Sequence, residues 1–217
     1  VEIARDYTNK WMTAVTMVDD QVYLGTEDQF HLFSSRRKLA TMDDQERRRL
    51  ETVGMFHLGE FVNRFKKGSL VMHLPERESK GSGAGGVVAA GESGVSGSGV
   101  GAASKSTSSA STPHLFATIN GVIGVVASLT KRQYHFLKKV EGAMERVVQG
   151  VGGLSHRRFR AYLTPDNRYE DSKYFVDGDL VEKYLSLDPK DMQKVAKILK
   201  MDVDVIMRHI ETAARVH

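Results

Sequence analysis

The sequence predicts a β-propeller fragment, about two four-stranded antiparallel blades, followed by a C-terminal α-helical domain. The first observation is a change of sequence period near Leu129: short apolar runs alternate with turn residues before it, and apolar residues recur every three to four positions after it. These spacings are typical of strands and of amphipathic helices. The second is a count of roughly eight strands, which is about two blades of a propeller with four strands each. We therefore expect the blades in residues 1–128 and the helical domain in residues 129–217.

The first half begins with three short apolar runs separated by polar turns. We expect strands at residues 11–18, 22–26 and 30–34. Asp19-Asp20 and Glu27-Asp28 lie between them, and two-residue connections are typical of tight hairpins. A charged segment at residues 43–52 follows, and we expect it to be helical.

Further strands are expected at residues 55–65, broken at Gly59, at 70–74, and from Leu115 into 123–129. Asn120-Gly121 is the strongest hairpin signal, because a type I′ turn needs a positive φ at both central positions. The Gly/Ser/Ala tract at 79–112 has no aromatic residue and can bury little surface. We expect it to be a disordered loop inserted into a hairpin, because strand signals continue on both sides.

The second half contains several helix-start signals. Thr130 with Gln133 predicts a capping box, and Gly150 lies just past the predicted helix end, where a left-handed residue is common. Later starts are indicated by residues that typically cap helices. They are Asp179 with Glu182, Asp188-Pro189 and Asp202.

Composition and spacing point away from catalysis and metal binding. The chain has no cysteine, which excludes a disulfide scaffold and a Cys-ligated zinc site. Its eight histidines are scattered, without two ligands one helical turn apart. Asp177-Gly178-Asp179 lacks the later ligands of a calcium loop, so helix capping is the better interpretation. We expect no catalytic residues, metal or cofactor.

Basic residues gather in three clusters within a chain of net charge +4. Solvated faces produce the same pattern, so contact with nucleic acid or protein remains an open alternative. The clusters are Arg36-Arg37-Lys38, Arg47-Arg48-Arg49, and His156-Arg157-Arg158 with Arg160.

Seven motifs occur in the order found in a known family. They are residues 11–15, 23–32, 56–63, 68–72, 118–124, 150–156 and 177–180. Together they resemble the C-terminal region of the DNA damage-binding protein 1 family, and the resemblance covers nearly the whole chain except 79–112. The chain is more distantly similar to the large propeller subunits of the cleavage/polyadenylation factor and of a splicing factor.

The resemblance implies the last blades of a third propeller and the helical domain of a non-enzymatic adaptor. Such an adaptor serves a cullin-RING ubiquitin ligase in DNA repair, in the nucleus and also the cytoplasm. It holds WD-repeat substrate receptors, while the cullin docks on a propeller that this chain lacks. The matching motifs place receptor-facing positions at Arg5, Trp11, Phe61, Asn63 and Ile119. Arg64 stands at a partner-facing position that is usually apolar in the animal form.

Two alternatives stay open. Trp11 and Phe61 have the side-chain type of interface anchors, but they also suit the core of a blade. The alternative function is a nucleic-acid-binding scaffold subunit of an mRNA cleavage/polyadenylation or splicing complex, with damaged DNA or RNA as its ligand.

Overall fold

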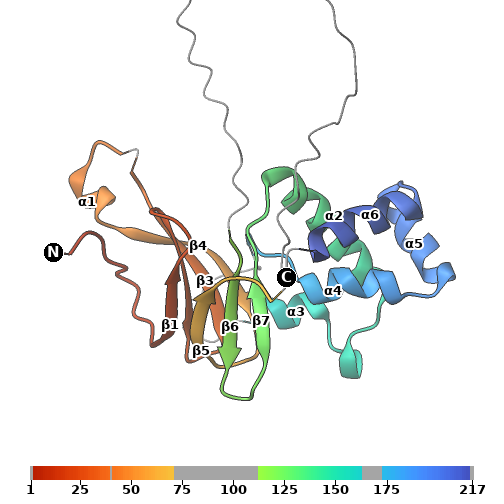
Figure 1. Cartoon of the computed structure of the whole chain (residues 1–217), viewed down its shortest axis with the longest axis horizontal. Coiled ribbons are helices and arrows are strands. Elements are labelled where there is room, and N and C mark those ends of the chain that lie inside the picture. Colours follow the sequence, from red (N-terminus) through yellow and green to blue (C-terminus); the bar gives the residue numbers. More distant parts are fainter. Residues whose placement is uncertain (1, 40, 71–111, 163–172, 216–217) are drawn as a thin grey trace, which may run out of the picture. The chain divides into compact units, whose positions relative to one another are not determined.

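The computed structural model describes residues 2–39, 41–70, 112–162 and 173–215. This part of the chain forms two antiparallel sheets, and most of its helices follow toward the C-terminus (Figure 1). The change of period near Leu129 therefore marks a real change of secondary structure.

The first sheet is a four-stranded meander in which each strand pairs with the next along the chain. Its apolar core is formed mainly by β2, β3 and β4, through Leu24, Leu32, Phe33, Met55 and Phe56. The strands are β1 (Met12–Met17), β2 (Val22–Glu27), β3 (His31–Arg37) and β4 (Leu50–His57).

The charged insert is less helical than its composition predicts. Helix α1 covers only Asp44–Arg47, with Asp43 as its N-cap. The expected helix through residue 52 is wrong, because β4 begins at Leu50, opposite Arg37 of β3. Pairing with an existing strand satisfies backbone groups that a marginal four-residue helix would leave open.

The second sheet has three strands in chain order, and the break predicted at Gly59 separates it from β4. The hairpin predicted at Asn120-Gly121 is present between β6 and β7, but the expected type I′ turn is wrong, because Gly121 has a positive φ of 85° and Asn120 does not have a positive φ. The backbone N–H of Gly68 donates to the carbonyl of Pro113 over 2.9 Å. The strands are β5 (Val62–Lys67), β6 (His114–Thr118) and β7 (Ile123–Val126). The strand expected at 70–74 and the tract at 79–112 lie almost wholly outside the described residues.

The helical part has a core of its own. Its buried residues include Val140 and Met144 on α2, Tyr184, and Ile206 and Ile210 on α6. The helices are α2 (Lys131–Val147), α3 (His156–Arg160), α4 (Gly178–Glu182), α5 (Pro189–Leu199) and α6 (Val203–Ala214), with 3-10 turns η1 (Val151–Gly153) and η2 (Lys183–Ser186). All apolar side chains of this core come from residues 129–213.

The predicted caps are only partly correct. The Thr130–Gln133 capping box is present. Helix α4, however, is capped by Asp177, whose side chain accepts from the backbone N–H of Leu180, so Asp179 is inside the helix. The prediction of a left-handed cap at Gly150 is wrong: α2 ends at Val147, and a Cβ on Gly150 would lie 2.0 Å from the Leu154 carbonyl oxygen. That glycine is needed for a close backbone approach.

Candidate partner-docking site

The two sheets meet through β1 and β5. The Nε2 atom of the buried His114 lies 3.1 Å from the carbonyl oxygen of Met17. Toward the other end of β1, Thr26 of β2 pairs with Ala14, and the hydroxyl of this buried Thr26 lies 3.5 Å from the carbonyl oxygen of Val62 in β5. At the Thr26–Val62 end, backbone hydrogen bonds bring three connections close to one another: residues 28–30, 58–61 and 119–122.

Phe61 lies where these connections meet. Its carbonyl accepts from the backbone N–H of Ile119 over 3.1 Å. Its ring packs edge-on against Phe30, with ring centroids 6.3 Å apart. Phe61 is half-buried, whereas Ile119 is 63% exposed. Two residues 58 positions apart in the sequence are therefore neighbours at the end of the sheets.

Phe30 is the residue that motif reasoning missed. It has a φ of 65°, and its carbonyl accepts from the N–H groups of Leu58 and Gly59 over 2.9 and 3.3 Å. A positive φ is uncommon for a bulky residue and marks an over-determined position. The sequence places Phe30 in a strand run, and nothing in that run signals the turn that points its ring toward Phe61.

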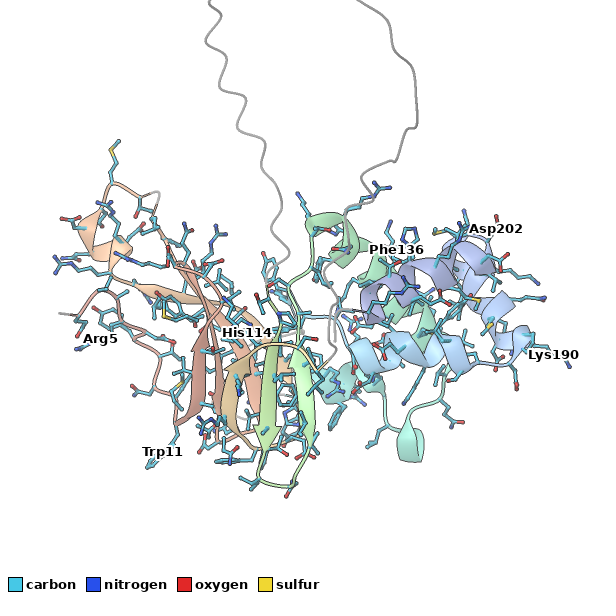
Figure 2. All side chains as sticks on the ribbon, viewed as in Figure 1. Arg5, Trp11, His114, Phe136, Lys190 and Asp202 are labelled. Atoms are coloured by element: carbon cyan, nitrogen blue, oxygen red, sulfur yellow. The ribbon has the colours of Figure 1, made fainter. Side chains whose placement is uncertain are left out.

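Trp11 extends the same edge. Its carbonyl accepts from the backbone N–H of Asp28 over 3.0 Å, two residues before Phe30. The side chain is 79% exposed and projects from the end of the sheet in Figure 2. It borders a hollow of about 550 Å³ lined partly by Met12 and Gln29. In this chain Trp11 is therefore outside the buried core.

Asn63 and Arg64 are exposed on β5, beside Phe61. The pairing of β5 with β6 shifts between Val62 and Arg64, so Asn63 is the extra residue of a β-bulge. Bulges redirect side chains and bend the strand locally. We call Trp11, Phe30, Phe61, Asn63, Arg64 and Ile119 the aromatic edge.

Arg5 does not belong to this edge. Its backbone pairs with the segment beside α1: its N–H donates to the Arg48 carbonyl, and its carbonyl accepts from Leu50. Its guanidinium forms a 2.7 Å ion pair with Glu2. Leu50 pairs with Arg37 at the end of the sheet opposite the β2–β3 connection. The six positions implied by the resemblance are thus divided between two places, and Figure 2 shows Arg5 apart from Trp11.

A charged network joins the four-stranded sheet to the helices. The Nε of Arg160 donates to Asp177 over 2.6 Å, and its Nη1 donates to the carbonyls of His57 and Leu58. Burial raises the pKa of Asp177, but the hydrogen bond from His156 and the Arg160 guanidinium outweigh burial and lower it to about 2. Asp177 is therefore a carboxylate at neutral pH.

His57 lies on the sheet side of the same network. Its ring contacts His31, Phe159 and Tyr162 edge-on or at a tilt, with centroids about 5 Å apart. Burial, followed by the charges of His31 and Arg160, lowers the pKa of His57 to about 4. The third basic cluster thus has a structural role, since His156 and Arg160 both contact Asp177.

The described residues offer little for metal chemistry. Within the ranges that the structure covers, no three His, Asp or Glu side chains come together in a way that would hold a metal ion. In the same ranges, no helix combines the length and apolar character needed to cross a membrane. The aromatic edge presents exposed Trp11 and Ile119 side chains beside the half-buried Phe61, and aromatic residues of this kind are common at protein interfaces.

Comparison with known proteins agrees with the motifs. A family model described as the CPSF A subunit region matches residues 1–186. Over 216 residues the chain is 40% identical to DNA damage-binding protein 1 of Solanum lycopersicum and 38% identical to DNA damage-binding protein 1a of Arabidopsis thaliana. Each match covers 100% of this chain and 17% of the relative, so the chain spans 17% of the length of these proteins. The resemblance drawn from the seven motifs is confirmed.

Proposed function

Since the chain belongs to the CPSF A subunit family, we propose that it is the C-terminal part of a non-catalytic adaptor that docks WD-repeat substrate receptors of a cullin-RING ubiquitin ligase. The adaptor acts in DNA repair and protein ubiquitination, in the nucleus and also the cytoplasm. Its cullin contact lies in parts of the longer protein that these 217 residues do not include.

The two sheets are the last blades of a propeller in this proposal. Their meander order and the contact between the first strands, β1 and β5, support it, because adjacent blades of a propeller meet around its central channel. Residues 1–128 supply the blades and residues 129–217 the helical domain. The separate apolar core of the helices supports that boundary.

The aromatic edge is the proposed receptor-binding surface, and the exposure of Trp11 is the observation that carries the proposal. An exposed tryptophan ring keeps a large apolar surface in contact with water. The binding free energy becomes more favourable when a partner covers that surface. Phe61 and Ile119 extend the apolar area, while Asn63 and Arg64 provide hydrogen-bond donors beside it. An amphipathic receptor helix matches this combination of apolar and polar groups.

The test is a titration of the whole chain with a fluorescent peptide that covers the docking helix of a WD-repeat receptor. Trp11→Ala should weaken binding by about 2 kcal/mol, roughly 30-fold, as expected for a hot-spot residue. Tyr7→Ala is the matched control: Tyr7 is an exposed aromatic residue four positions earlier, and it lies outside the edge. Both variants should melt like the wild type, since both side chains are exposed.

Equal affinity of Trp11→Ala and wild type for the receptor helix would refute the proposed surface. A wild-type chain that does not bind the helix at all would refute the adaptor function itself for this fragment.

A further inference from the structure

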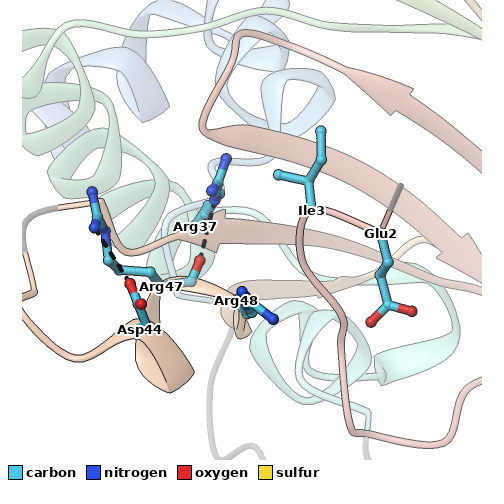
Figure 3. A pocket seen from close by; sticks show the side chains of 6 residues that line it. All are labelled: Glu2, Ile3, Arg37, Asp44, Arg47 and Arg48. Carbon is cyan, nitrogen blue, oxygen red and sulfur yellow. Dashed lines mark hydrogen bonds and ion pairs between the residues drawn. The ribbon is translucent and has the colours of Figure 1, made fainter.

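The first two basic clusters of the sequence come together in space. The Nε of Arg37, at the end of β3, donates to the carbonyl of Arg47 in α1 over 3.1 Å. With Arg48, these residues line a surface hollow of about 480 Å³, shown in Figure 3. Arg49 extends the group toward the N-terminal segment, where its guanidinium lies 5.8 Å from the ring centroid of Tyr7. We call Arg37, Arg47, Arg48, Arg49 and Tyr7 the arginine surface.

The carboxylates nearby are already paired. Glu2 forms its 2.7 Å ion pair with Arg5, and Asp44 lies 3.5 Å from Arg47. Among the described residues, Arg37, Arg48 and Arg49 have no ion pair with a carboxylate. Three guanidinium groups therefore keep their charge available for an external anion.

We propose that the arginine surface binds the phosphodiester backbone of single-stranded nucleic acid. Arginine suits phosphate because its planar guanidinium donates two parallel hydrogen bonds and is weakly hydrated. Tyr7 favours nucleic acid over an acidic peptide as the ligand of this surface. Its ring is 65% exposed beside Arg49, and an aromatic face next to a basic groove is the arrangement on which unpaired bases stack.

This surface is separate from the aromatic edge. Arg37 pairs with Leu50 at one end of the four-stranded sheet, whereas Trp11 and Phe30 lie at the other end. The proposal therefore adds a second binding site to the receptor-docking function, and substitutions distinguish the two. Trp11→Ala should leave the affinity for nucleic acid unchanged.

The experiment measures fluorescence anisotropy of labelled oligo-dT and oligo-U, about 20 nucleotides long, with the whole 217-residue chain across a salt series. The wild type should bind both at about 50 mM salt. The triple variant R47Q/R48Q/R49Q should bind at least 10-fold more weakly. The negative slope of log affinity against log salt should become shallower by about 2, since each of the three lost phosphate contacts on a single strand contributes about 0.7.

The matched control is K139Q/K190Q/K197Q, which removes the same charge from exposed positions on α2 and α5. It should retain most of the affinity. Tyr7→Ala should weaken binding severalfold without changing the salt slope, because stacking releases no counterions. Thermal melts of all variants should match the wild type.

Three outcomes overturn the proposal. The first is a wild-type chain that does not bind at about 50 mM salt. The second is an equal loss in the arginine variant and the lysine control, which indicates net charge alone. The third is a poly-glutamate peptide that competes as well as oligo-dT of equal charge, which assigns the surface to acidic peptides.

Discussion

The guanidinium of Arg160 donates to the carboxylate of Asp177 over 2.6 Å, and it also donates to the carbonyls of His57, the last residue of β4, and of Leu58. Asp177 in turn caps α4, and its backbone N–H donates to the buried carboxylate of Glu141 on α2. Arg160 and Asp177 together thus connect α2, α3 and α4 to β4. Removing one partner of a buried pair leaves the other charge unsatisfied, which is usually costly.

Arg160→Gln should lower the free energy of unfolding by about 3 kcal/mol, the scale of an uncompensated buried charge. Urea denaturation at pH 7 measures this. Arg158→Gln removes the same charge from an exposed position of α3, and it should change stability by less than about 0.5 kcal/mol. Equal effects of the two variants would show that the Arg160–Asp177 pair adds nothing at this junction.

His57 should make stability depend on pH between about 6.5 and 4. Its pKa is lowered to about 4 in the folded state, so the unfolded chain binds a proton first as the pH falls. The contribution of His57 is fully present above about pH 6.5 and is lost as the pH falls toward 4. Urea titrations at pH 7.0, 5.5 and 4.5 should show falling stability, and His57→Gln should flatten that part of the profile. An unchanged slope in the variant would mean that His57 is solvated.

Gly54→Ala should destabilise the chain by more than 1 kcal/mol, because a Cβ there would lie 2.7 Å from the backbone oxygen of Lys173, and overpacking against backbone relaxes poorly. Gly142→Ala is the opposite case. It lies within α2, and beyond the neighbouring backbone of that helix no atom lies within 4 Å of the added Cβ, so we expect a gain of roughly 0.5–1 kcal/mol from helix propensity. Thermal melting of both variants is sufficient, and a neutral Gly54→Ala would show that residues 173–175 do not pack closely on β4.

Thr130→Ala should cost about 1 kcal/mol, because the Thr130 hydroxyl and the Gln133 side chain form a reciprocal capping box at the start of α2. Asp188→Ala is the control, since Asp188 makes no side-chain capping hydrogen bond at α5. It should cost only a few tenths of a kcal/mol. Helix content and urea midpoints of the two variants give the comparison, and a larger loss for Asp188→Ala would contradict the capping assignment.

Local signals predicted the strands and helices well where pattern and pairing agree. The Asn120-Gly121 turn and the Thr130 capping box follow from side-chain chemistry within four residues. The start of β4 at Leu50 could not be predicted in this way, because pairing with Arg37 outweighs the helical composition around it. Asp177 replaces Asp179 as a cap because its other carboxylate oxygen contacts Arg160, a tertiary contact.

The residues of the candidate sites were also predicted only in part from local sequence patterns. Family motifs brought Trp11, Phe61 and Ile119 to attention, and the structure places them on one edge. They also suggested Arg5, which lies elsewhere, and they did not suggest Phe30, whose positive φ depends on hydrogen bonds from Leu58 and Gly59. The joining of two arginine clusters ten residues apart required the register of β3 and β4. Long-range pairing supplies the information that a local pattern lacks.

The hydrogen bond between Gly68 and Pro113 has a practical consequence for experiments on this chain. It closes the β5–β6 ladder at the point where residues 71–111 leave and re-enter the described structure. A reporter protein whose termini lie close together is therefore suited to replace that segment, since loop closure depends only weakly on loop length. Such a chimera would carry an internal fluorescent label, with both termini of the chain left free of tags.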